Sequence, residues 1–121
     1  MRRLSSHRPE RLAALVQAAV ASALTSEVKD PRVGFVTVTA VRVAPDASHA
    51  TVHVSVLGSD EEKAGAMAGL NSARGFLRSH LSRVLPLRTA PELHFVLDRT
   101  LERAARIDQM LGEIKRDEPD A

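Results

Sequence analysis

Two segments rich in β-branched residues, separated by a four-residue turn, constrain the fold most strongly. They span residues 33–43 and 48–57, and Ala44-Pro45-Asp46-Ala47 between them is typical of a turn. The second segment alternates between apolar and polar side chains, which predicts an antiparallel hairpin with one covered face and one face open to water. In the first segment two pairs of apolar residues compete for the covered face: Phe35 with Val41, and Val36 with Val38.

An amphipathic helix is predicted before the hairpin. Apolar residues from Leu12 to Leu24 recur at i, i+3 and i+4, and Pro9 suits the first turn of such a helix. The segment also imitates a secretory signal peptide, because a pair of arginines precedes an apolar stretch. Gln17 interrupts that stretch while the helical spacing continues through it, so we interpret it as a helix that faces the core.

Helices and a third strand are predicted after the hairpin. Ser59 and Glu62 have the spacing of a capping box, and the helical pattern that follows is interrupted at 73–75, which favours two helices meeting at a kink. Residues 92–99 alternate like a strand, and a last amphipathic helix is predicted from Leu101. The order αββααβ plus a C-terminal helix predicts an α+β fold, with a three-stranded sheet covered by helices on one face.

The length and composition favour a single domain. With 121 residues, of which 44% are hydrophobic, the chain can close one core and is too short for two. We therefore expect one domain over residues 1–116 and a short acidic tail over 117–121. The chain contains no cysteine, which excludes disulfides, thiolate metal sites and cysteine nucleophiles and fits a cytoplasmic location.

The charges are segregated along the chain, although the net charge is only +2. Residues 1–11 carry four arginines and one glutamate, and residues 72–106 carry seven arginines and three acidic residues. Other acidic residues gather at 60–62 and in the tail. This distribution suggests a basic surface that meets a polyanion, with nucleic acid as the first candidate. The alternatives are a solvated surface of mixed charge and the arginine bias of a GC-rich genome.

Catalytic and metal sites find little support in the residue pattern. On an extended strand His49 and His53 would be about 13 Å apart, at about 3.3 Å per residue, which is too far to share a zinc ion. The chain has no nucleophile elbow, no Walker loop and no dinucleotide fingerprint. The carboxylates at 60–62 are explained by the favourable charge at a helix N-terminus. We therefore expect no enzymatic activity, no cofactor and no metal.

Three segments in register with the predicted elements resemble the ribosome-binding factor A family. They are residues 29–34 before the first strand, 73–78 at the helix junction and 87–95 leading into the third strand, within a resemblance over roughly residues 8–114. It implies a KH-like domain of the second topological type that binds the small ribosomal subunit or its precursor. It further implies a role in late maturation and processing of small-subunit rRNA, important above all in the cold. The implied partners are rRNA near the decoding region and, functionally, the maturation GTPases that release such factors. We expect a monomer that does not associate with membranes.

The expected RNA contacts are mostly arginines. Ala73-Arg74-Gly75 stands where ordinary KH domains have a GXXG loop, as the family's pattern implies, so clamping of single strands is not expected. Tyr and Trp are absent and the three phenylalanines occupy core-like positions, so recognition of phosphates and shape is predicted rather than base stacking. The candidate RNA-binding residues are Arg8, Arg11, Lys29, Arg32, Ala73, Arg74, Gly75, Arg78, Arg83 and Arg88.

Some of these residues have structural alternatives. Gly75 could serve tight helix packing instead of RNA contact. Asp30 could cap a turn with Arg32 folded back onto it, which we favour for Asp30 and not for Arg32. As a whole, the chain could instead be a small αβ module that binds a protein or oligomerises through the uncovered sheet face. An unrecognised hydrolase is the third hypothesis.

Overall fold

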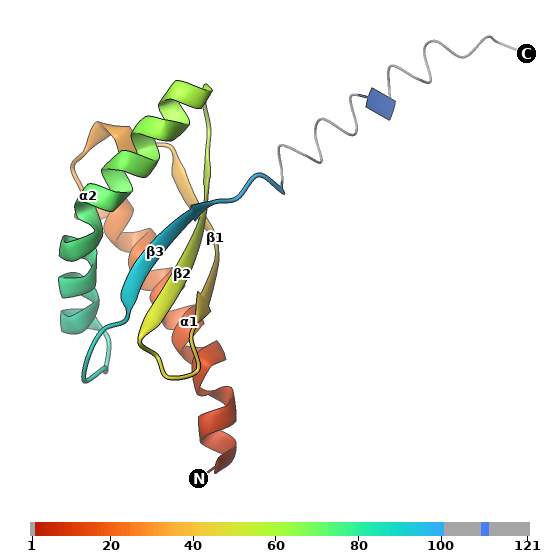
Figure 1. Ribbon diagram of the computed structural model, residues 1–121. Coiled ribbons are helices and arrows are strands. Elements are labelled where there is room, and N and C mark those ends of the chain that lie inside the picture. The colour runs from red at the N-terminus through yellow and green to blue at the C-terminus, as the bar shows by residue number, and fades with distance from the viewer. Residues whose placement is uncertain (1, 101–109, 112–121) are drawn as a thin grey trace, which may run out of the picture.

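Two long helices pack on a three-stranded sheet (Figure 1). The computed structural model describes residues 2–100 and 110–111, with side chains from residue 10 onward. The elements in chain order are helix α1 (Arg2–Ser26), the short 3₁₀ helix η1 (Pro31–Val33), strands β1 (Val36–Val43) and β2 (His49–Val56), helix α2 (Asp60–Val84) and strand β3 (Glu92–Leu97). The predicted α+β class and the three-stranded sheet are confirmed.

The core lies between the helices and one face of the sheet. All four apolar residues of β2 that alternate along the strand are buried, as predicted. Three of them, Ala50, Val52 and Val54, belong to one core cluster with Val16 and Val20 of α1 and with Leu70 and Leu77 of α2. The side chains between them on β2 are only partly covered. The sheet therefore has one face under the helices and one face open to solvent.

The sheet is mixed, in the order β1-β2-β3. Strand β1 runs antiparallel to β2, and β3 runs parallel to β2 because α2 carries the chain back to the starting edge. A bulge shifts the register between Val38 and Ala40. Val36 and Val38 face the core before the bulge, as one alternative predicted, and Val41 of the other pair faces it after the bulge, whereas Phe35 does not.

The bulge residue Thr39 is tied to the end of β3. Its hydroxyl donates to the Asp98 carboxylate at 2.9 Å and lies 3.2 Å from the carbonyl oxygen of His53. Hydrogen bonds from Thr100 and from Thr39 lower the pKa of Asp98 to about 2. The contact holds the two edge strands together at one end of the sheet.

The first strand begins later than predicted. Residues 31–33 form η1, and Asp30 caps it by accepting a hydrogen bond from the Arg32 amide at 2.9 Å. The side chain of Val33 is buried beneath this turn, whereas Phe35 is 68% exposed. Phe35 lies between the end of η1 and the start of β1 at Val36, so it does not take part in the alternation of the strand. The prediction that Phe35 is a core residue was therefore wrong.

Helix α2 is one continuous element of 25 residues, and the predicted division into two helices at 73–75 was wrong. Its ribbon changes direction partway along (Figure 1), which accounts for the turned apolar face that the sequence displays. The capping box is confirmed. The Ser59 hydroxyl accepts from the Glu62 amide, and the Glu62 carboxylate accepts from the Ser59 amide, both at 3.1 Å.

The N-terminal helix is longer than predicted, and most of the C-terminal segment lies outside the described residues. Helix α1 begins at Arg2, so Pro9 lies inside it and not in its first turn. The helix predicted from Leu101 and the tail over 117–121 fall outside the described residues, apart from the helical pair 110–111. Within the described residues, no helix is both long enough and apolar enough to cross a membrane.

Candidate nucleic-acid interface

The exposed side of α2 is basic and free of acidic residues along most of its length. All the carboxylates of the helix are in its first turn, and the chain has no Asp or Glu from Lys63 to Pro91. Arg74, Arg78 and Arg83 are exposed on this helix. Among the described residues, none of these three arginines forms an ion pair with a carboxylate. Their charges are therefore available to an anion from solution.

Gly75 and Ser79, one turn apart, lie along the middle of this exposed side, which we call the crest of α2. A Cβ atom at position 75 would meet nothing within 4 Å, so the structure gives no support to a role for this glycine in tight helix packing. The adjacent exposed position one turn on is Ser79, which is also small. A ligand could therefore approach the helix backbone closely at this point.

The glycine that does serve close packing is Gly69, which the sequence analysis did not single out. A Cβ atom there would lie 3.0 Å from Cγ1 of Val33 and 3.3 Å from Cβ of Arg32. The absence of a side chain lets η1 pack directly on α2. Gly69 therefore positions the turn that carries Lys29 and Arg32.

Arg74 and Arg78 form one flank of the crest, one helical turn apart. The Arg78 side chain also has a structural role, because its Nε donates to the carbonyl oxygen of Ala90 at 3.1 Å. This bond joins α2 to the loop before β3. Arg78 and Arg88 line a groove of about 420 Å³ together with Leu12 of α1 and the turn between β1 and β2.

The opposite flank carries an aromatic side chain. Phe76 is two residues from both Arg74 and Arg78, which places it about 200° around the helix from each. It is 45% exposed, lies in a stacked arrangement on His80 with ring centroids 6.5 Å apart, and shares a groove with Lys29 and Ala73. The expectation that all three phenylalanines are in the core was wrong, since the rings of Phe76 and Phe35 are exposed.

Arg32 is engaged within its own turn. Its guanidinium lies 2.6 Å from Oδ2 of Asp30, and its Nε donates to the same carboxylate at 3.0 Å. Hydrogen bonds from the Arg32 side chain and amide lower the pKa of Asp30. The alternative in which Arg32 folds back onto Asp30 is therefore the observed one, and among the candidate cations with described side chains Arg32 is the one that pairs with a carboxylate.

The two remaining candidates lie on α1. Arg11 is exposed and directly precedes Leu12, which lines the groove with Arg78 and Arg88. Arg8 belongs to the same helix, but its side chain lies outside the described part of the molecule. The candidates thus form two groups on the two flanks of α2. On one flank Arg78 shares a groove with Arg88, and Arg74 and Arg11 lie next to this groove in the chain. On the other flank Lys29 and Ala73 share a groove with Phe76, and Arg83, seven residues after Phe76, lies about two turns further along the helix.

The sequence as a whole matches one family of proteins. The model of the family described as ribosome-binding factor A matches residues 8–111. The ribosome-binding factor A of Carboxydothermus hydrogenoformans is 46% identical over 117 residues, covering 97% of this chain and 94% of its own length.

Solved structures lead to the same family. The crystal structure of ribosome-binding factor A from Thermus thermophilus aligns with a TM-score of 0.68 and 32% identity, over 76% of this chain and 97% of that chain. A homology model of the Thermus thermophilus protein, fitted into the cryo-EM map of a 30S–RbfA complex, aligns with a TM-score of 0.60 and 32% identity, over 71% of this chain and 90% of that chain. Because the family model and the relatives match nearly the whole length of this chain, it belongs to the ribosome-binding factor A family.

Proposed function

We propose that this chain is an assembly factor that binds the small ribosomal subunit or its precursor and assists the late maturation and processing of small-subunit rRNA. It acts by binding and carries out no covalent chemistry. The observation that carries this proposal is the acid-free exposed side of α2, with arginines that no carboxylate neutralises among the described residues. The proposal draws its ribosomal target from the family and from the relative that was fitted into the map of a 30S complex.

The shape of α2 suggests how it would contact RNA. Phosphates of one strand would meet Arg74 and Arg78, and those of a neighbouring strand would meet Arg83 and Lys29 on the other flank. The small side chains at the crest allow the backbone of structured RNA to come close to the helix. The exposed ring of Phe76 adds one aromatic surface on which an unpaired base could stack.

The expected partners follow from the family. The chain would act in the cytoplasm as a monomer, contact rRNA near the decoding region, and be released with the help of a maturation GTPase. Six of the candidate cations, namely Arg11, Lys29, Arg74, Arg78, Arg83 and Arg88, are exposed and form no carboxylate pair in the described part of the structure. If about five of them each neutralise one phosphate, the logarithm of the binding constant should fall with the logarithm of salt concentration with a slope of about −3 to −5.

Sedimentation through a sucrose gradient tests the proposal. The full-length protein is expected to travel with small subunits at low salt and to be released as salt is raised. The variant Arg74→Glu/Arg83→Glu should bind more weakly and show a salt slope that is smaller by about 2. Arg42→Glu is the matched control, because Arg42 is exposed on the open face of the sheet, away from α2.

Three results would contradict this assignment. Normal binding by Arg74→Glu/Arg83→Glu would remove α2 from the interface. Loss of binding in Arg42→Glu alone would place the interface on the open sheet face. Dimerisation without any binding to particles would favour the alternative of a protein-interaction module.

A further inference from the structure

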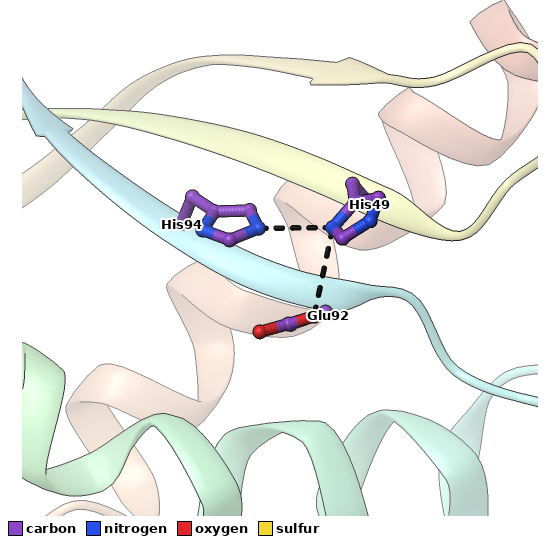
Figure 2. Close-up of side chains that lie close together, drawn as sticks. All are labelled: His49, Glu92 and His94. Atoms are coloured by element: carbon purple, nitrogen blue, oxygen red, sulfur yellow. Dashed lines mark hydrogen bonds and ion pairs between the residues drawn. The ribbon is translucent and has the colours of Figure 1, made fainter.

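The pairing of β2 with β3 brings together three side chains that are far apart in the sequence. In this parallel register His49 is opposite Glu92, and His94 is opposite the residue two positions after His49. All three side chains lie on the open face of the sheet (Figure 2). The cluster is therefore separate from the basic side of α2, which covers the other face.

The donor atoms of these side chains converge. Nδ1 of His49 is 3.0 Å from Nε2 of His94 and 3.6 Å from Oε2 of Glu92. One donor atom from each of the three residues can be chosen so that all lie within 4.8 Å of one another. In a tetrahedral zinc site with bonds of about 2.0–2.1 Å, neighbouring donor atoms are about 3.3 Å apart. The two distances from His49 are within a few tenths of an ångström of that spacing.

We propose that Nδ1 of His49, Nε2 of His94 and a carboxylate oxygen of Glu92 bind one divalent transition-metal ion, with zinc as the best match. Two imidazoles and one carboxylate form a donor set that zinc uses in sites with an open position, where water completes the coordination. The sequence analysis compared His49 only with His53, four residues along the same strand. The partner across the strand pair is His94.

The surroundings of the cluster favour a cation that arrives from solution. The side chains of His49 and Glu92 are 53% and 46% exposed, so a hydrated ion can reach them. Hydrogen bonds from the Ser48 hydroxyl and amide, with a smaller contribution from the nearby His49 imidazole, lower the pKa of Asp46, whose carboxylate adds negative charge beside the site. Arg42 lies on the same face, opposite Thr51 on the β1 side of β2, and its exposed charge is screened by water.

A bound ion would join two neighbouring strands. Strand β3 is a six-residue edge strand, and the metal would link its first and third residues to the first residue of β2. Because an ion that binds only the folded state stabilises it, zinc at ten times its Kd should raise the Tm by roughly 6 °C. With three protein ligands on an exposed face, we expect a Kd on the order of 10 μM.

Calorimetric titration of the full-length, untagged and chelator-treated protein with zinc chloride tests this site. One ion per chain is expected, together with the rise in Tm. His49→Ala and His94→Ala should each weaken binding by about tenfold or more, because each removes one of three ligands. Glu92→Gln leaves both imidazoles in place and should also weaken zinc binding. This milder variant provides the test if a histidine variant does not fold.

His53→Ala is the matched control, because His53 is on the same strand and the same open face as His49 but outside the cluster. It should bind zinc like the unmodified chain. Unchanged affinity in both His49→Ala and His94→Ala would overturn the proposal, and so would the absence of any heat or Tm shift up to about 1 mM zinc. These results are independent of ribosome binding, which is measured with other variants.

Discussion

Replacement of Gly75 by alanine separates the stability of α2 from its proposed contact with RNA. Gly75 is in the interior of a continuous helix, its φ is not positive, and an added Cβ would meet nothing within 4 Å. Glycine in such a place costs about 0.5–1 kcal/mol relative to alanine, because its backbone loses more freedom on folding. Gly75→Ala should therefore raise the free energy of unfolding by that amount.

The corresponding shift in Tm is small but measurable. A domain of about 100 residues changes its Tm by about 4 °C for each kcal/mol, so Gly75→Ala should melt about 2–4 °C higher. Gly65→Ala is the matched control, because Gly65 lies in the same helix and its added Cβ would also meet nothing within 4 Å. Both variants should show the same increase when helix melting is followed by circular dichroism.

The two variants should differ in binding to small subunits. A methyl group at position 75 stands on the crest between the basic flanks, where close approach of RNA is proposed, whereas position 65 lies near the acidic start of the helix. Co-sedimentation should therefore weaken for Gly75→Ala and not for Gly65→Ala. A Gly75→Ala protein that gains stability and binds particles normally would refute the close approach at the crest. A Gly75→Ala protein that melts lower would refute the reasoning about free space.

Two further predictions concern stability. Arg78→Ala removes the hydrogen bond to the α2–β3 loop and should lower the free energy of unfolding by about 1 kcal/mol in urea denaturation, whereas Arg74→Ala should change it by less than about 0.5 kcal/mol. Hydrogen bonds from Thr100 and Thr39 lower the pKa of Asp98 from 3.8 to about 2, so they stabilise the fold above the ordinary pKa, and this contribution is lost as the pH falls toward 2. Asp98→Asn should flatten the dependence of Tm on pH in that window, and an unchanged dependence would argue against the contact.

The sequence predicted those parts of the fold that depend on local pattern. Strand β2 alternates without interruption, and its four apolar residues are the buried ones. The capping box of Ser59 and Glu62 needs only residues three positions apart, and it was located correctly. Interactions of this kind are readable because the residues that make them are close in the chain.

The facing of β1 could not be settled from its own residues. The register shift at Val38/Ala40 changes the buried parity partway along the strand, and only the pairing with β2 reveals it. The same limit applies to the candidate site. Pairing between Arg32 and Asp30 depends on the geometry of η1, and the exposure of Phe76 depends on where α2 rotates against the sheet.

The lengthwise separation of charge on α2 has a consequence for how the molecule meets a large polyanion. Three carboxylates occupy the first turn and Arg83 occupies the last, at the two ends of a helix of about 37 Å. In the field of ribosomal RNA such a rod experiences a torque that repels its beginning and attracts its far end. The protein would thus be rotated before it touches the particle, so that a larger fraction of encounters would occur in the orientation that binds.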